Sequence, residues 1–194
     1  MSFSRGSTLV TTPLETAHLS LIPSAPDHLL ALIDQPDQFE AIAGLALAAE
    51  LRGFYVSGAV SPDWVAALRR ASERAEHADP WRHGFFITER PERRVIGSAG
   101  FKGPPDAGGA VEIAYGVVPS REGLGYATEA AGALVRFASA DERVRVIRAH
   151  TLPEPNASTR VLTKCGFVHT GDVVDPEDGP VWRWERSAAH IGTP

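Results

Sequence analysis

The sequence predicts a single mixed α+β domain in which a mostly antiparallel central sheet is flanked by helices. Three observations support this fold class. Apolar residues recur at helical spacing early in the chain, three strand-like segments follow one another in the middle, and strands then alternate with helices. No repeat or linker interrupts the 194 residues, so we expect a flexible arm at 1–14, one domain at 15–187 and a C-terminal tail at 188–194.

The first part of the domain is predicted to hold one strand and several helices. A short apolar strand is expected over His18–Ile22, and Leu and Ile at helical spacing predict a helix over Asp27–Ile33, with Ser24 as its cap. The region Gln38–His77 reads mainly as helices. Within it, Ser61-Pro62-Asp63 is typical of a helix start, with a hydroxyl cap and a proline in the first turn.

The rest of the domain is predicted to be rich in strands. Segments of β-forming residues separated by turn residues predict an antiparallel meander over Gly84–Thr88, Val95–Phe101 and Val111–Val118. The alternating elements that follow are expected to be an Ala-rich helix at Gly125–Ser139, a strand at Val144–Thr151, a helix at Ala157–Lys164 and strands at Phe167–Asp172 and Val181–Glu185.

Composition and charge exclude several classes of function. The formal net charge is −5, with 24 acidic against 19 basic residues, which argues against a nucleic-acid partner. Cys165 is the only cysteine, so neither an internal disulfide nor a cysteine-rich zinc site is expected, and no His or acidic pair has the spacing of metal ligands. No stretch approaches the roughly 18 apolar residues of a membrane helix, and no signal pattern opens the chain. We therefore expect a cytoplasmic protein without a metal or membrane partner.

The turn between Val118 and the Ala-rich helix is the segment that is most informative about function. Pro119 blocks continuation of the strand, and Gly123 and Gly125 open a helix whose first N–H groups point outward. Glycines there let an anion approach the main chain, so the turn is suited to binding phosphate, although an ordinary strand-to-helix turn would use the same residues. Thr128 at the third glycine position disfavours a dinucleotide site of Rossmann type, and no Gly-Lys-Ser or Gly-Lys-Thr of a P-loop follows.

Three segments together resemble the GNAT superfamily of N-acetyltransferases, in particular its branch that acetylates the N-termini of ribosomal proteins. Gly-Leu-Gly-Tyr-Ala-Thr-Glu-Ala at 123–130 resembles the family's cofactor motif. Asn156–Phe167 resembles the branch's Asn-x-x-Ser segment that ends in Lys-x-Gly-Phe, although Ser158 falls one residue early and Thr159 holds the expected place. The segments 95–101 and 111–115 resemble the two strands that precede the cofactor turn.

The resemblance implies a GNAT-like sheet and transfer of an acetyl group from acetyl-CoA to a primary amine by direct attack. The acceptor would be a peptide N-terminus or a small molecule. A catalytically silent acyl-CoA-binding sensor or scaffold is the alternative, and a homodimer is left open. The residues expected to bind the cofactor are Val118, Arg121, Glu122, Gly123, Leu124, Gly125, Tyr126, Ala127, Thr128 and Asn156.

Glu122 departs from the family's pattern, because the family has Gln or Arg at this position and Arg121 comes one residue earlier. A carboxylate about 6 Å from a phosphate costs up to about 3 kcal/mol at an effective dielectric near 20. We therefore expect Glu122 to point to solvent or to pair with Arg121.

The resemblance also suggests the residues that move protons. Glu112, on the strand before the cofactor turn, is the candidate base; a solvated strand glutamate is the alternative. Many members have a tyrosine acid in the second motif, but that position is Leu162 here, so Ser158 is the candidate acid, with Thr159 as its substitute. Asn156 is expected to cap the following helix, to contact the cofactor, or both.

Other polar and aromatic residues are assigned structural roles. His150 lies near the expected cleft, but a lone histidine is more often structural. Cys165 is interpreted as a small buried residue, and Trp182 and Trp184 as packing against the sheet. The acceptor walls would come from Gln38–His77, where no motif identifies the amine.

Overall fold

The computed structural model describes residues 12–51, 61–176 and 179–188. Its described strands form one sheet in the order β1-β2-β4-β5-β6-β7-β9-β8, with β3 paired to β5 beside this path. The strands are β1 (Leu14–Glu15), β2 (Leu19–Pro23), β3 (Ala46–Leu47), β4 (Phe85–Glu89), β5 (Arg94–Phe101), β6 (Ala110–Val117), β7 (Val146–Thr151), β8 (Val168–Asp175) and β9 (Gly179–Ser187). The predicted fold class is confirmed, including the antiparallel meander β4-β5-β6.

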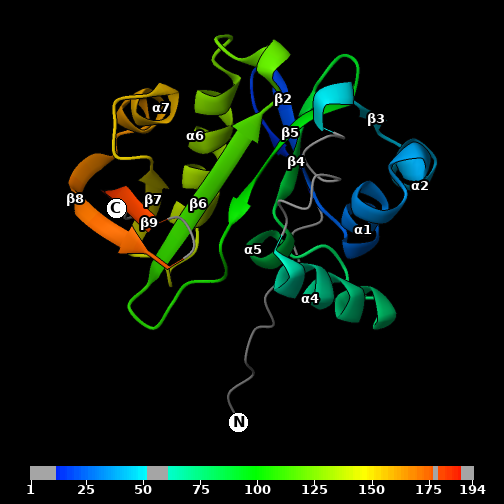
Figure 1. The fold of residues 1–194 in the computed structure, drawn as a ribbon, viewed down its shortest axis with the longest axis horizontal. Helices are drawn as coiled ribbons and strands as arrows, with labels where there is room; N and C mark the ends of the chain where they lie inside the picture. The colour runs from blue at the N-terminus through cyan, green and yellow to red at the C-terminus, as the bar shows by residue number, and fades with distance from the viewer. Residues whose placement is uncertain (1–11, 52–60, 177–178, 189–194) are drawn as a thin grey trace, which may run out of the picture.

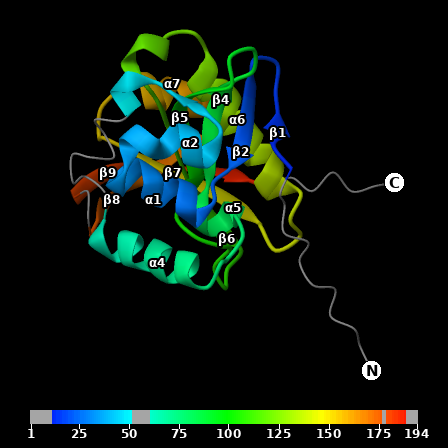
Figure 2. The same ribbon diagram turned by 90° about the vertical axis from the view of Figure 1, so that its right-hand side faces the viewer.

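Helices cover both faces of the sheet. The described helices are α1 (Pro26–Asp34), α2 (Phe39–Ala43), α4 (Pro62–Glu73), α5 (Pro80–His83), α6 (Tyr126–Ser139) and α7 (Ala157–Lys164), with 3-10 turns η1 (Pro36–Gln38) and η2 (Pro119–Arg121). Figure 1 shows α6 and α7 beside β6, while α1, α2 and α4 lie beyond β4 and β5. In Figure 2 the strands β4 and β5 stand between α1 and α2 on one side and α6 on the other.

The composition of α6 explains how closely it packs on the sheet. Its buried face consists mainly of alanines, together with Leu134 and Val135, and small side chains let a helix approach a sheet closely. At its C-terminal end, Phe137 contacts Trp81, Phe85 and Phe101, with ring centroids 5.1 to 5.7 Å apart. This aromatic cluster joins α6 to α5 and to the end of β5.

Strands β6 and β7 separate halfway along their length, and this separation creates the functional region. The two strands are parallel neighbours only from Ala110 to Glu112, opposite Val146 to Arg148. Beyond Glu112, β6 continues to Val117 and β7 to Thr151 without pairing to each other. The unpaired ends leave a gap in the sheet beside the turn that leads into α6.

Several local predictions need correction. Short elements without a clear apolar period were not predicted, namely β1, β3 and α5. Ser24 does not cap α1: Ala25 holds that position, and Ser24 is buried with its N–H donating to the Gly84 carbonyl. Ser61 does stand at the N-cap of α4, but its hydroxyl makes no capping bond.

The terminal segments are only partly described. Residues 1–11 of the predicted arm lie outside the described residues, and Leu14 already pairs with Leu21 in β1. At the other end, Ala188 is buried and its N–H donates to the Arg145 carbonyl, so the described domain extends one residue into the predicted tail.

Candidate active site

The turn between β6 and α6 has the geometry that binding of an anion requires. Gly125 is the N-cap of α6 with φ 86°, and Gly123 has φ 75°, so both need the left-handed conformation that glycine adopts readily. A Cβ built on either glycine would meet no atom within 4 Å, which means that open space lies in front of both. The backbone conformation alone explains the glycines, and the open space also gives a ligand access to the helix N-terminus.

A cavity of about 340 Å³ lies in front of this turn, between α6 and α7. It is bordered by the end of β6, the turn, the first residues of α6 and one face of α7. The predicted site residues that line it are Arg121, Glu122, Gly123, Gly125, Tyr126, Ala127, Thr128 and Ser158. The structure thus brings the two motifs, some thirty residues apart in the sequence, to one cavity.

Three predicted cofactor residues do not line this cavity. Val118 is buried, and its N–H donates to the Ile96 carbonyl, which fixes the end of the strand. The side chain of Leu124 is turned outward and is 60% exposed. Asn156 caps α7, since its Oδ1 accepts from the Thr159 N–H at 3.0 Å. Its capping role is confirmed, whereas its contact with a cofactor stays a prediction.

Of the two arrangements expected for Glu122, the pairing with Arg121 is not observed. Arg121 makes a two-point contact with Glu89 at the end of β4, with its Nε 2.8 Å from Oε1 and its Nη2 3.3 Å from Oε2. Glu122 is exposed at the rim of the cavity, which agrees with the expectation that it points to solvent.

Two cations of α7, which the sequence analysis overlooked, also line the cavity. Arg160 and Lys164 are four residues apart, so they share a helix face with Ala157 and Val161. That spacing was the signal that could have identified them. Both are suited to bind phosphate groups held at the N-terminus of α6.

The first turn of α7 gives the two hydroxyl candidates different surroundings. The Thr159 hydroxyl accepts from the Asn156 N–H at 3.1 Å and donates to the Asn156 carbonyl at 2.9 Å. Thr159 is also buried. Its hydroxyl is part of the capping box, and its proton is already donated to the Asn156 carbonyl. Ser158 is exposed and lines the cavity.

Glu112 belongs to a cluster of charged groups and is not simply solvated. Its Oε1 lies 2.8 Å from the Lys102 ammonium and 3.0 Å from His150 Nδ1. His150 is therefore not the isolated histidine that the sequence indicated. Since a carboxylate accepts a proton donated from Nδ1, the neutral ring carries its lone pair on Nε2. This atom is buried without a hydrogen-bond partner among the described residues.

A second cavity, of about 390 Å³, lies across the sheet from the first. Side chains alternate along a strand, so Glu112, Ala114 and Gly116 share one face of β6 while Tyr115 and Val117 face α6 and α7. Tyr115 and Gly116 border both cavities. The two cavities therefore approach each other where β6 and β7 have separated. Glu112 is on the same face of β6 as the second cavity, but it lines a separate cavity of about 190 Å³.

Tyr115, to which the sequence analysis gave no role, holds a hydroxyl at this junction. Within the described part of the chain the hydroxyl is buried and has no hydrogen-bond partner. Burial raises the pKa of Tyr115 well above its usual value, with the nearby Cys165 adding to the shift. The group stays protonated at neutral pH, so it can donate a hydrogen bond as well as accept one.

Three structural interpretations are supported. Cys165 is buried, and burial raises the pKa of its thiol, so it is not a thiolate. Trp184 is buried and its indole N–H donates to the Thr151 hydroxyl at 3.1 Å, while Trp182 packs against the core. Leu162 is fully buried and cannot supply the acid that many relatives place there.

Glu129, inside the cofactor motif, turns away from the cavity and fixes the N-terminal strand. Its carboxylate accepts from the Thr16 hydroxyl and from the N–H groups of His18, at 2.7 Å, and Leu19, at 3.1 Å. Burial by itself would raise the pKa of Glu129, but these hydrogen bonds outweigh it and hold the pKa at about 2.

Comparisons with known proteins agree with this geometry. The family model described as "Acetyltransferase (GNAT) domain" matches residues 31–168, so the chain belongs to the GNAT acetyltransferase family. A curated relative from Bacillus subtilis (strain 168), "Uncharacterized N-acetyltransferase YjdG", is 32% identical over 84 residues, which cover 43% of this chain and 50% of the relative. The match thus spans half of that relative's length.

Solved structures share the fold at low sequence identity. A ribosomal-protein-S5-alanine acetyltransferase from Vibrio fischeri superposes with a TM-score of 0.62 at 15% identity, over 94% of this chain and 100% of the other. RimL, a ribosomal L7/L12 alpha-N-protein acetyltransferase in complex with coenzyme A, gives 0.61 at 16% identity, over 90% and 97%. These similarities establish the GNAT fold.

The described residues contain neither a membrane-spanning helix nor a cluster of metal-binding side chains. Among residues 12–51, 61–176 and 179–188, no helix is long and apolar enough to cross a membrane. The same residues contain no group of three or more His, Cys, Asp or Glu side chains placed to hold a metal ion.

Proposed function

We propose that this chain transfers an acetyl group from acetyl-CoA to a primary amine, either a peptide N-terminus or a small molecule, by direct attack. One observation carries the proposal: a cavity at the N-terminus of α6 and a cavity on the other face of the sheet meet at Tyr115 and Gly116. A thioester held on one side and an amine held on the other would meet in that gap, and such positioning supplies much of the rate.

The first cavity is proposed to hold the phosphate groups of coenzyme A. The open space before Gly123 and Gly125 exposes the N–H groups that begin α6, and Arg160 and Lys164 add positive charge on α7. We assign the cofactor contacts to the predicted residues of the turn and the start of α6, and to these two cations. Glu122 at the rim would turn its carboxylate to solvent.

Glu112 is proposed to remove the ammonium proton, directly or through water, because it lies on the acceptor face next to the gap. Lys102 and His150 hold its Oε1, which orients the carboxylate. Ser158 is proposed to protonate the departing thiolate, because its hydroxyl is exposed in the cofactor cavity. The Tyr115 hydroxyl is the second candidate acid.

A silent acyl-CoA-binding sensor is the second candidate function. It is favoured by the fully buried Leu162 in the position where many relatives have a tyrosine. A cytoplasmic location and a homodimer stay predictions.

The test combines cofactor binding with turnover. At a hundredfold excess over its dissociation constant, acetyl-CoA should stabilise the protein by about 2.7 kcal/mol, whereas NAD and ATP should not. Release of free thiol from acetyl-CoA is then measured against a panel of amines and peptides. A sensor would bind acetyl-CoA without consuming it, and stabilisation by NAD in place of acetyl-CoA would contradict both candidates.

A further inference from the structure

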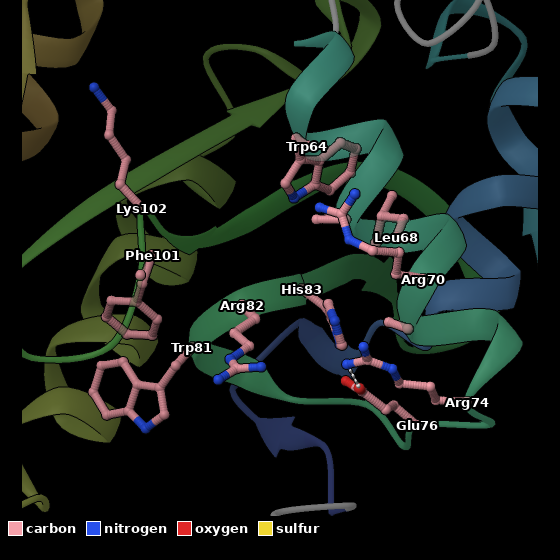
Figure 3. A pocket seen from close by; sticks show the side chains of 13 residues that line it. Trp64, Leu68, Arg70, Arg74, Glu76, Trp81, Arg82, His83, Phe101 and Lys102 are labelled. Carbon is pink, nitrogen blue, oxygen red and sulfur yellow. Dashed lines mark ion pairs between the residues drawn. The ribbon is translucent and has the colours of Figure 1, made fainter.

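A third cavity, of about 370 Å³, extends the acceptor side between α4, α5 and the end of β5. It shares Trp64, Arg82, His83 and Phe101 with the cavity that reaches Tyr115. The two spaces are therefore neighbours along one groove. A molecule whose amine lies at the gap in the sheet could extend its other end into this third cavity (Figure 3).

Three arginines extend into this cavity from two helices. Arg70 lies in the last turn of α4, Arg74 is the C-cap residue that follows this helix, and Arg82 comes from α5. Figure 3 shows the three guanidinium groups around His83 between the helices, while Lys102 points away from them. Lys102 pairs with Glu112, so it is not part of this arginine cluster.

The arginine cluster is poorly neutralised by the protein. Arg74 lies 3.7 Å from Glu76 and Arg82 lies 3.5 Å from Asp79, and both arginines are largely exposed. Such pairs contribute little. Among the residues that the structure describes, no carboxylate pairs with Arg70.

Three arginines elsewhere in the chain are held more closely by carboxylates. The distances are 3.0 Å for Arg69 to Asp34, 2.8 Å for Arg121 to Glu89 and 2.6 Å for Arg148 to Glu185. In a chain with a net charge of −5, this cavity therefore gathers three arginines whose carboxylate partners are distant or, for Arg70, lacking among the described residues.

Apart from the arginines, Glu76 and Lys102, the cavity is lined mainly by apolar side chains, with His83 as a neutral hydrogen-bond donor. Trp64, Leu68, Trp81 and Phe101 line it. His83 Nδ1 accepts from the Asp79 N–H at 3.0 Å, so the proton of the neutral ring is on Nε2. Burial lowers the pKa of His83, and Arg82 adds to this effect against the opposing carboxylates, which favours the neutral ring.

We propose that Arg70, Arg74 and Arg82 bind an anionic group of the amine acceptor, a carboxylate or a phosphate, while its apolar body lies against Trp64 and Phe101. Guanidinium groups bind both anions with two parallel hydrogen bonds, and aromatic walls suit an apolar linker. This inference rests on the proposed acetyl transfer and specifies its acceptor class. It excludes polyamines, whose second cation would face three arginines.

The test compares matched amines and matched variants. Phenethylamine is the neutral reference, 4-(2-aminoethyl)benzoate and O-phosphotyramine carry the two anions, and spermidine carries further cations. We expect kcat/KM for at least one of the two anionic amines to exceed that for phenethylamine about tenfold, with spermidine the poorest. This advantage should shrink as the ionic strength rises from about 0.05 to about 0.5 M.

Arg70→Gln should lower the advantage of the anionic amine about fivefold through KM, as expected for the loss of one solvent-exposed ion pair. Activity with phenethylamine should not change. Arg69→Gln is the matched control, because Arg69 is the neighbouring residue of α4 but pairs with Asp34 outside the cavity. Equal effects of the two variants, or no preference for an anion in the wild type, would overturn the inference.

A binding measurement separates this inference from the proposed function. O-phosphotyramine is titrated calorimetrically into the protein saturated with coenzyme A, in the wild type and in Arg70→Gln. Binding that depends on Arg70 in the absence of any turnover would retain the anion site and reject acetyl transfer. Turnover of neutral, cationic and anionic amines at equal efficiency would retain acetyl transfer and reject the anion site.

Discussion

The cofactor side and the acceptor side of the molecule are built in different ways. The cofactor cavity comes from two continuous segments, 115–128 and 157–164, and its central feature is main chain at a helix N-terminus. The acceptor cavities combine side chains of α1, α4, α5, β5 and β6, which lie far apart in the sequence. A site made of local main chain leaves a readable motif, whereas a site assembled from distant side chains does not.

The largest effect is expected on the acceptor side, at Glu112. Glu112→Gln keeps the size of the side chain and an oxygen that can accept hydrogen bonds from Lys102 and His150, but it removes the negative charge and the base. We expect kcat to fall about a thousandfold, within the range of general-base catalysis, while acetyl-CoA affinity stays near wild type. The acidic limb of the pH–rate profile should move or vanish when one amine is used for both proteins.

Glu185→Gln is the matched control, because Glu185 is a half-buried carboxylate that pairs with Arg148 on the same sheet. Near-normal kcat in Glu112→Gln, with an unchanged acidic limb, would make Glu112 only a strand residue. A raised KM for the amine with normal kcat would instead make it the docking site of the ammonium.

The next test distinguishes which hydroxyl, that of Ser158, Thr159 or Tyr115, protonates the departing thiolate. Ser158→Ala should lower kcat about a hundredfold with little change in acetyl-CoA affinity. Thr159→Val, which removes the hydroxyl of the capping box, should lower stability by about 1 kcal/mol and leave kcat nearly unchanged. Steady-state kinetics and thermal unfolding of both variants provide the measurements.

Tyr115→Phe completes this test, because it removes only the buried hydroxyl. We expect its kcat to remain within about threefold of wild type, far less than a general-acid role would cost. A large loss in Tyr115→Phe together with a loss below tenfold in Ser158→Ala would transfer the acid role to Tyr115.

The cofactor side can be disrupted without unfolding it at Ala127, in the first turn of α6. Ala127→Asp adds a carboxylate where the helix N-terminus favours one, so the free protein should not lose stability. A phosphate about 8 Å away would be repelled by about 2 kcal/mol, which weakens acetyl-CoA binding roughly thirtyfold. Calorimetric titration measures the affinity, and Ala127→Asn controls for size.

Gly125→Val would be a poorer choice. At φ 86° a β-branched residue is strained, by about 1–2 kcal/mol, so lost binding could not be separated from a damaged turn. Unchanged acetyl-CoA affinity in Ala127→Asp would mean that no phosphate lies at this turn.

The smallest effect concerns Glu129, which belongs to the cofactor motif but not to the cavity. Glu129→Gln should lower Tm at pH 7 by about 3 °C, the shift expected from about 1 kcal/mol at a partly exposed carboxylate, and leave acetyl-CoA affinity unchanged. The folded-state pKa of about 2 lies below the usual glutamate value of 4.5, so the contribution is present above about pH 4.5 and is lost as the pH falls toward 2.

Thermal unfolding between pH 7 and pH 2.5 measures this effect. The difference in Tm between wild type and variant should narrow below about pH 4.5. A constant difference across this range would show that the charge of Glu129 does not stabilise the N-terminal strand.

The sequence by itself determined the order of the long elements and the cofactor turn. Periodicity and β-propensity give the strands of the meander and the helices α6 and α7, because these segments are long and apolar on a defined face. Pro119, Gly123 and Gly125 identify the turn, because a sharp change from strand to helix restricts which residues can stand there. The capping role of Asn156 follows for the same local reason.

Tertiary structure alone decided the partners of the side chains. Arg121 binds Glu89 and not its neighbour Glu122, and His150 contacts Glu112, because sheet pairing brings distant residues closer than the chain does. The same holds for the arginine cluster, in which α5 places Arg82 opposite Arg70 and Arg74. Sequence periodicity assigns a residue to a face of its own helix or strand, but only the packing of that face against others determines which charges meet.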